Sequence, residues 1–231
     1  MLSRKDSERG RLLQQFVRAR IVNMIGIDVG LYDFDRHNAI YFFIVSPDEQ
    51  IYLRYGGRDA ASPDTYLDLD SFALALRRGL AQHARWSEGT LPRAPRPAEL
   101  RPKQIEALRE KEIARNRCVE CHMIGDYLAV AQEQAGKLDK RQNMFRSPDL
   151  KRIGLHLDVP RGLAVARVEG PAQAAGLRAG DEIVSFAGHE VLTFGDLLFR
   201  YDQTERQAKH VSLAVERTPS GQIDNHFTIT Q

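Results

Sequence analysis

The sequence has little cysteine and no long apolar run. Its 231 residues contain two cysteines, Cys118 and Cys121, which lie in one short segment. The longest apolar run, Ala39 to Val45, is far too short to span a bilayer. The first thirty residues carry charge throughout and show no secretory signal. We therefore expect no membrane span in this chain.

An excess of charge of one sign is also missing. Lysine and arginine number 33 against 31 aspartates and glutamates, which gives a formal net charge of +2. Proteins that bind nucleic acid usually carry a clustered basic excess, so the balance gives no support for a nucleic-acid partner. Apolar residues make up 42% of the chain and charged residues 28%, which allows a hydrophobic core and argues against global disorder.

Proline divides the chain, because four of its ten prolines fall within residues 87–103. A stretch with prolines at this density cannot hold a helix and stays extended. We predict a Pro/Arg linker there, with a mixture of α/β and α+β architecture around it. The predicted parts are an N-terminal domain (1–86), the linker (87–103), a helical segment (104–150) and a β-rich C-terminal domain (151–231).

Hydrophobic periodicity predicts the elements on both sides of the linker. In the N-terminal domain we expect a polar helix over 3–16, strands over 17–24, 38–45 and 50–55, and a helix from Asp68 or Asp70 to Trp86. In the helical segment we expect helices over 104–116 and 123–134, with a stop at Gly136.

The C-terminal domain contains a run of fixed turn residues, GPAQAAGLRAGDEI over 170–183. Pro171 starts a one-turn helix, and Gly176 ends it where a left-handed backbone is needed. Gly180 and Asp181 then turn the chain into a strand. The run resembles the core of a bacterial PDZ domain, in which the pattern is P-A-x-x-A-G-L-x-x-G-D-x-I. The resemblance covers Ile153 to Gln231.

The PDZ resemblance implies a site for the C-terminal or extended peptide of a protein partner. Domains of this family take a peptide against a sheet edge, and loop N–H groups cap its terminal carboxylate. Lys151 adds positive charge near that position, and Arg152 stands where the family's loop has its first glycine. The implied peptide-binding residues are Arg152, Ile153, Gly154, Leu155, Leu157, Leu197, Leu198 and Tyr201. Two alternatives are that these apolar side chains form core, or that the chain itself fills the groove.

Residues 118–122 read CVECH and match the C-x-x-C-H pattern of c-type haem attachment. Two thiols at this spacing reach the two vinyl groups of a haem, and the adjacent histidine lies under the iron. The segment resembles the haem-binding site of c-type cytochromes. The resemblance implies haem c as the cofactor, held by Cys118 and Cys121 and ligated by His122.

Met144 is the best candidate for the sixth iron ligand, because it follows the second expected helix in a loop. Met/His ligation favours electron transfer, which implies a redox partner. His156 is the second choice. The alternative for Met144 is a side chain that fills a gap in the core.

Two other chemistries use the same segment. Cys118 and Cys121 are also a candidate redox dithiol, tuned by Glu120 and His122. With one distant ligand, Cys118, Cys121 and His122 are a candidate zinc site. Haem attachment implies an oxidising, extracytoplasmic compartment. We expect the protein to be periplasmic, or tethered to a membrane through an N-terminal segment that is missing from this sequence. The haem interpretation therefore predicts that the chain is a mature or truncated form.

The strand order β-β-β-α in the N-terminal domain is similar to the C-terminal part of a thioredoxin-like fold. The domain has no cysteine pair, and no proline precedes the strand that begins at Asn38, so the resemblance implies no thiol–disulfide chemistry there. The run GIDVGLYDFD over 26–35, the CVECH segment and the PDZ-like run occur in an order that resembles a bacterial family of multidomain proteins. That resemblance implies the domain order and no particular activity.

Catalytic motifs are missing: the sequence has no G-x-S-x-G, no metal-protease helix motif and no phosphate-binding loop. Three hypotheses follow. The first is an extracytoplasmic haem c protein that transfers electrons and docks partners through its PDZ domain. The second is an interaction scaffold without haem, and the third is a thiol–disulfide redox protein.

Overall fold

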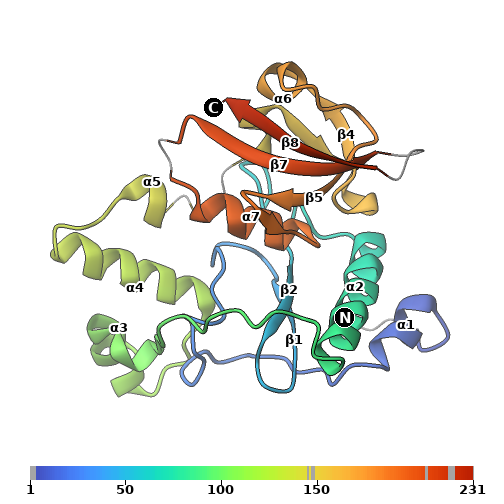
Figure 1. Cartoon of the computed structure of the whole chain (residues 1–231). Coiled ribbons are helices and arrows are strands. Elements are labelled where there is room, and N and C mark those ends of the chain that lie inside the picture. The colour runs from blue at the N-terminus through green and yellow to red at the C-terminus, as the bar shows by residue number, and fades with distance from the viewer. Residues whose placement is uncertain (1–3, 145, 147–148, 206–207, 218–221, 231) are drawn as a thin grey trace. The chain divides into compact units, whose positions relative to one another are not determined.

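The structure is a computed structural model that describes residues 4–144, 146, 149–205, 208–217 and 222–230 (Figure 1). Every strand pair in these ranges is antiparallel. The fold is therefore a mixture of helices and small antiparallel sheets, which confirms the α+β part of the predicted class. No helix in the described ranges combines the length and apolar character needed to cross a membrane.

The chain divides into two compact units, each built from separate stretches of sequence. Unit 1 comprises Met1–Gln15, Ala39–Pro92 and Ser147–Gln231, and unit 2 comprises Phe16–Asn38 and Arg93–Arg146. The predicted parts were consecutive ranges. In the structure the hairpin and helix after residue 38 share a unit with the C-terminal part, whereas residues 16–38 share one with the CVECH segment.

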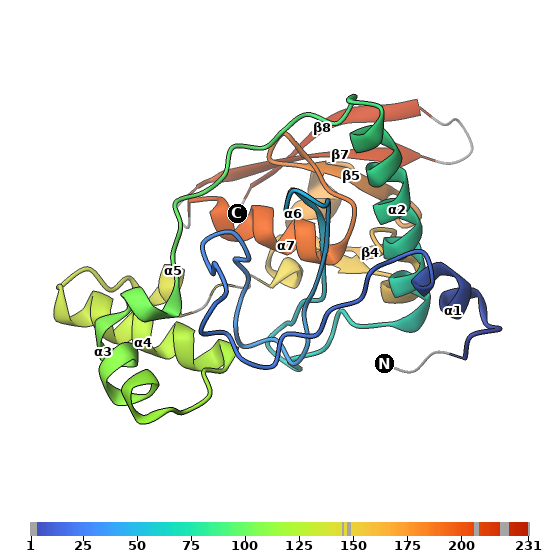
Figure 2. The ribbon, with the colours of Figure 1, turned by 90° about the horizontal axis from the view of Figure 1, so that it is seen from below.

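The first part of unit 1 consists of α1 (Glu8–Leu13), β1 (Phe42–Val45), β2 (Ile51–Tyr55) and α2 (Leu69–Ser87). The hairpin β1–β2 and α2 follow the predicted positions within a few residues. Figure 2 shows α1 beside α2, where Arg77 forms an ion pair with Glu8.

Helix α2 begins at its expected cap and packs on the hairpin through aromatic rings. The Asp68 side chain accepts hydrogen bonds from the first N–H groups of the helix. The ring centroid of Phe72 lies 5.0 Å from that of Phe42 and 5.1 Å from that of Tyr55. A Cβ added at Gly79 would lie 2.7 Å from Ile44 Cδ1, so the glycine permits the close approach of helix and strand.

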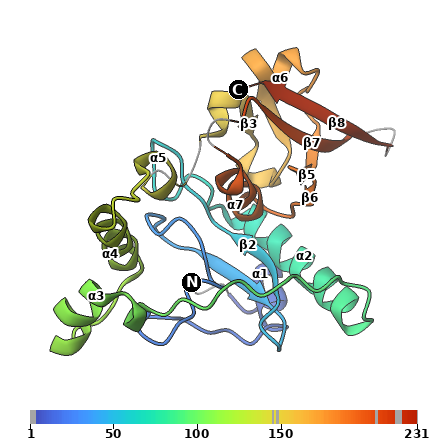
Figure 3. The same ribbon diagram turned by 60° about the vertical axis from the view of Figure 1, so that its left-hand side comes forward.

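The C-terminal module of unit 1 combines strands, among which β7 and β8 are the longest, with the helices α6 and α7 (Figure 3). Its elements are the 3₁₀ helix η3 (Leu150–Ile153), β3 (Leu155–Leu157), the 3₁₀ helix η4 (Val159–Arg161), β4 (Val165–Val168), α6 (Gly170–Ala174), β5 (Glu182–Phe186), β6 (His189–Glu190), α7 (Phe194–Gln203), β7 (His210–Arg217) and β8 (Gln222–Thr230). The strands form one sheet of order β6-β5-β7-β8 and a second of order β3-β4. The expected one-turn helix is α6, and Gly176 after it has φ +92°.

A buried ion pair fixes the turn before β5 to the end of β7. Asp181 accepts hydrogen bonds from Arg217 Nε at 2.8 Å and Nη2 at 3.1 Å. The Asp181 side chain is 4% exposed, so this two-pronged contact lies inside the module. It holds the turn that the GD dipeptide predicted.

Unit 2 is mainly helical. Its elements are the 3₁₀ helix η1 (Pro102–Gln104), α3 (Glu106–Lys111), the 3₁₀ helix η2 (Ile113–Arg115), α4 (Cys121–Gln134) and α5 (Lys140–Asn143). The core is small and consists of Val29, Ile105, Leu108, Val119 and Ile124. Helix α4 ends as expected, with Gly136 in a left-handed conformation.

Asp28 joins the two stretches of unit 2. Its Oδ1 accepts from the N–H groups of Gly30 and Leu31 at 3.1 and 3.2 Å, and from that of Leu100 at 3.1 Å. Burial alone would raise the pKa of Asp28, but these hydrogen bonds and Arg96 lower it overall. Part of the predicted linker is therefore anchored by side-chain contacts.

Three element predictions are wrong. Residues 17–24 form no strand, since their alternating side chains lack a partner strand among the described residues. The helix expected over 104–116 is broken into η1, α3 and η2, and Asn116 has a positive φ of 55°. The helix expected over 3–16 is reduced to α1 in its described part.

Candidate functional site

The CVECH segment lies at the start of α4, in unit 2. Cys121 is the first residue of the helix and is partly exposed, and Cys118 is exposed just before it. Both thiols are free. Val119 between them is fully buried, so the segment is anchored in the core while both thiols stay accessible.

The two predicted iron ligands are also accessible. The His122 side chain is 53% exposed, with Nδ1 3.6 Å from Glu120 Oε2. Met144 follows α5 and is 42% exposed, so the alternative of a buried gap-filler is wrong. In the part of the chain that the structure describes, no three His, Cys, Asp or Glu side chains are placed to hold a metal ion. His156 is engaged elsewhere, with Nε2 2.7 Å from Glu169 Oε1.

Residues 23 and 24 are hydrogen-bonded to the CVECH segment, and exposed apolar residues precede them in the chain. Met24 N–H donates to Val119 O at 2.9 Å, and Val119 N–H donates to Asn23 Oδ1 at 3.4 Å. The two residues before Asn23 are Ile21, 51% exposed, and Val22, 70% exposed.

A buried arginine lies beneath the first turns of α4. The Arg36 side chain is 6% exposed, and its Nη2 donates to Val29 O at 3.1 Å. Burial lowers the pKa of Arg36, and its electrostatic interactions with Asp33 and Cys121 oppose that shift. A Cβ added at Gly125 would lie 3.8 Å from Arg36 Cβ, which places the arginine stem against the helix. Sequence reasoning missed Arg36.

The second candidate site is the turn that leads into β3, in unit 1. Arg152 is exposed in the middle of η3, and Gly154 ends η3 with φ +77°. A Cβ at Gly154 would lie 1.8 Å from Glu169 O, so only glycine fits here. Gly154 lies two residues after Arg152, at the position where the loop of PDZ domains has its second glycine.

Most of the implied peptide-binding side chains belong to the buried core of the module. Leu157 is only partly buried and packs against that core. Fully or nearly fully buried are Ile153, Leu155, Leu197, Leu198 and Tyr201. Tyr201 packs on Phe186 with ring centroids 5.4 Å apart.

A segment from the hairpin side of unit 1 covers this region. Tyr66 is 5% exposed and belongs to the same core, with its ring centroid 4.8 Å from that of Phe194 at the start of α7. Lys151 Nζ donates to Asp59 Oδ2 at 2.9 Å. Neither Tyr66 nor Asp59 was predicted, since contacts across some ninety residues leave no local signal in the sequence.

The start of α7 is tied to β2 by a buried carboxyl group. Asp196 accepts from Arg54 N–H at 2.9 Å and from Leu192 N–H at 3.3 Å. Burial raises the pKa of Asp196 to about 6, although Arg54 and these hydrogen bonds act in the opposite direction. The Arg54 guanidinium lies 3.7 Å from the ring centroid of Phe199, which adds a cation–π contact.

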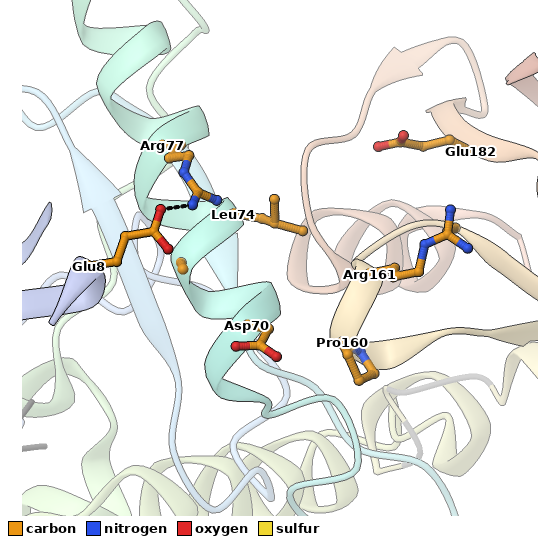
Figure 4. Close-up of a pocket in the computed structure, with 9 residues that line it drawn as sticks. Glu8, Asp70, Leu74, Arg77, Pro160, Arg161 and Glu182 are labelled. Atoms are coloured by element: carbon orange, nitrogen blue, oxygen red, sulfur yellow. Dashed lines mark hydrogen bonds and ion pairs between the residues drawn. The ribbon is translucent and has the colours of Figure 1, made fainter. Parts of the chain in front are cut away.

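An open cleft of about 410 Å³ lies in unit 1 (Figure 4). Its charged residues have partners: Glu8 pairs with Arg77, and Glu182 pairs with Arg78 outside the cleft lining. Asp70 lies 3.6 Å from Arg9. Arg161 lies 3.9 Å from Asp158. Because each charged lining residue has a partner of opposite charge, the cleft offers no unpaired charge that would select a ligand. The lining residues are Glu8, Asp70, Ala73, Leu74, Arg77, Pro160, Arg161, Ala164 and Glu182.

A scan against protein-family models finds no match to this chain, and a search of curated proteins finds no significant similarity.

Proposed function

We propose that the chain binds the carboxyl-terminal end of a partner protein through a PDZ-like module formed by residues 151–231. The observation that carries the proposal is the contact of Lys151 with a carboxylate, at the turn where a PDZ domain caps its peptide. An ammonium group at this position suits a terminal carboxylate for the same reason that it suits Asp59.

The edge of β3 supports an extended ligand. Among the described strands, β4 is the sole neighbour of β3. The opposite edge of β3 therefore has no strand partner in these ranges, and backbone N–H and C=O groups at such an edge pair readily with an added strand. Leu155 of β3 and Leu198 of α7 share one apolar core, which suits a large apolar side chain at the end of the peptide.

Selection from a random C-terminal peptide library tests the proposal. Selected peptides are then measured as free acids and as C-terminal amides. We expect amidation, and K151E in the protein, each to weaken binding about tenfold or more, because a charged hydrogen bond is lost. K137E changes an exposed lysine of unit 2 and should have no effect. Equal affinity for acid and amide would contradict the proposal.

A second candidate function is electron transfer by a covalently attached haem c in unit 2. The specific support is the combination of two free thiols in residues that are at least partly exposed and an exposed His122. In this proposal Cys118 and Cys121 would hold the haem through thioethers, His122 would ligate its iron, and Met144 is the proposed sixth ligand. A bound haem supplies one-electron redox chemistry. This function would require maturation in an extracytoplasmic compartment.

The haem proposal is tested by exporting the chain in a bacterium that attaches haem c. The intact mass should exceed the polypeptide mass by one haem, and C118S/C121S should abolish the increase. H122A should change the visible spectrum, whereas H189A, which alters an exposed histidine of unit 1, should not. A colourless protein of polypeptide mass would contradict haem binding. If the colourless protein reduces insulin disulfides and C118S stops the reaction, thiol–disulfide exchange by Cys118 and Cys121 replaces electron transfer as the proposed function of this site.

A further inference from the structure

Residues 57–66, named here the inner segment, contact the proposed peptide site through an aromatic ring. Tyr66 packs on Phe194, with its centroid 4.8 Å away. A Cβ added at Gly57 would lie 2.5 Å from Leu198 Cδ1 and 3.2 Å from Tyr66 Cδ2. Gly57 and Tyr66 therefore both pack closely against the first two turns of α7, the helix that borders the proposed peptide site.

The same segment supplies a carboxylate to η3, the turn on the other side of the site. Asp59 Oδ2 accepts from Lys151 Nζ at 2.9 Å, and the Asp59 side chain is only 3% exposed. Burial alone would raise the pKa of Asp59, but the hydrogen bonds from Lys151 and Thr65 hold it well below its usual range. Tyr66 also shares one buried cluster with Leu150 and Ile153 of η3, which Asp149 caps.

Hydrogen bonds within the inner segment hold it in a compact conformation. Tyr66 N–H donates to Gly57 O at 3.2 Å. Asp59 Oδ1 accepts from Ala61 N–H at 2.8 Å and from Ser62 N–H at 3.0 Å. One carboxylate oxygen thus organises the segment, and the other binds Lys151.

We propose that the inner segment is an internal ligand that occupies the peptide site, so that a partner peptide binds only when the segment leaves. This inference rests on the proposed peptide binding. Asp59 takes the place of the peptide's terminal carboxylate, and Tyr66 takes the place of its last apolar side chain. The peptide and the segment therefore compete for Lys151 and for the start of α7.

Competition between the inner segment and the peptide should weaken the apparent affinity for the peptide by a measurable factor. The apparent dissociation constant equals the intrinsic one divided by the fraction of molecules with an open site. If the segment is docked in about nine of ten molecules, releasing it strengthens peptide binding about tenfold. The variant that releases it is D59N/Y66A, which removes both anchors. D64N is the matched control, because Asp64 is exposed in the same segment and interacts with Ser62 and not with Lys151.

The experiment measures the affinity of a library-selected, free-acid peptide for full-length wild type, D59N/Y66A and D64N. We expect D59N/Y66A to bind about tenfold more tightly than the other two chains. Equal affinity of all three overturns the internal ligand and leaves peptide binding intact. If no chain binds any selected peptide, the proposed function itself fails, and the internal ligand fails with it.

Hydrogen exchange on the unmodified chain gives a second readout that needs no variant. Saturating peptide should accelerate exchange at the N–H groups of Ala61, Ser62 and Tyr66, which are hydrogen-bonded in the docked segment. Unchanged or slower exchange at these positions would overturn the proposal.

Discussion

Two buried carboxyl groups of unit 1 have pKa values shifted in opposite directions. Asp196 is surrounded by protein at the start of α7, and burial raises its pKa to about 6. Asp59 also has little solvent exposure, but its contact with Lys151 and its hydrogen bonds lower its pKa. Two causes differ: Asp196 is the more deeply buried group and receives hydrogen bonds mainly from backbone N–H groups, whereas Asp59 has a direct cationic donor in Lys151.

Asp196 gives the protein a specific pH dependence. Between its ordinary pKa of 3.8 and about 6, the native state keeps a proton that the unfolded state releases. The free energy of unfolding should therefore decrease as the pH rises through this range. Chemical denaturation at several pH values measures the slope, and D196N should flatten it. D59N is the control: Asp59 stabilises the fold above pH 3.8, so its loss should leave the slope between pH 3.8 and 6 unchanged. A D196N slope equal to the wild-type slope would contradict the assignment.

A pair of glycines separates backbone strain from steric overlap. Gly154 and Gly188 have similar positive φ values, +77° and +76°. A Cβ would lie 1.8 Å from Glu169 O at Gly154 but has open space at Gly188. We expect G188A to cost about 1 kcal/mol, from the backbone conformation alone, and G154A to cost clearly more. Thermal unfolding of both variants measures the difference, and equal losses would show that Glu169 moves aside freely.

At the level of helices and strands, local sequence signals predicted the positions of helices and turns well. They did not predict which strands pair over long separations in the sequence. Helix α2 begins directly after its cap Asp68, because the cap and the apolar spacing are local features of the sequence. The turns around α6 and β5 follow from Pro171, Gly176 and Gly180 for the same reason. The strand expected over 17–24 fails, since alternation marks an extended chain but does not supply a neighbouring strand.

The cap of α2 gives a prediction for that element. D68A should lower the free energy of unfolding by about 1 kcal/mol, because two N–H groups of the first turn lose their acceptor. D64A removes an exposed carboxylate four residues earlier, outside the helix, and should change stability by less than half as much. Denaturant titration of both variants checks this, and equal effects would mean that the loss is one of charge alone.

At the scale of the whole molecule, the sequence could not show that each unit is discontinuous. Residues 23–24 hydrogen-bond to Val119, and Asp28 hydrogen-bonds to Leu100, over separations of more than seventy residues. The candidate residues themselves were predictable: CVECH is a contiguous motif, and Gly154 was expected in the turn before β3. Their surroundings were not, because Arg36 beside Cys121 and Asp59 on Lys151 come from distant parts of the chain.

The central claim is that the turn around Lys151 receives the carboxylate of a partner peptide. Its most direct test is an NMR titration of isotopically labelled D59N/Y66A chain with a selected peptide. The account predicts the largest amide shifts at residues 151–157 and at the start of α7 for the free acid, and much smaller shifts for the C-terminal amide. Equal shifts for acid and amide, or shifts confined to unit 2, would contradict it.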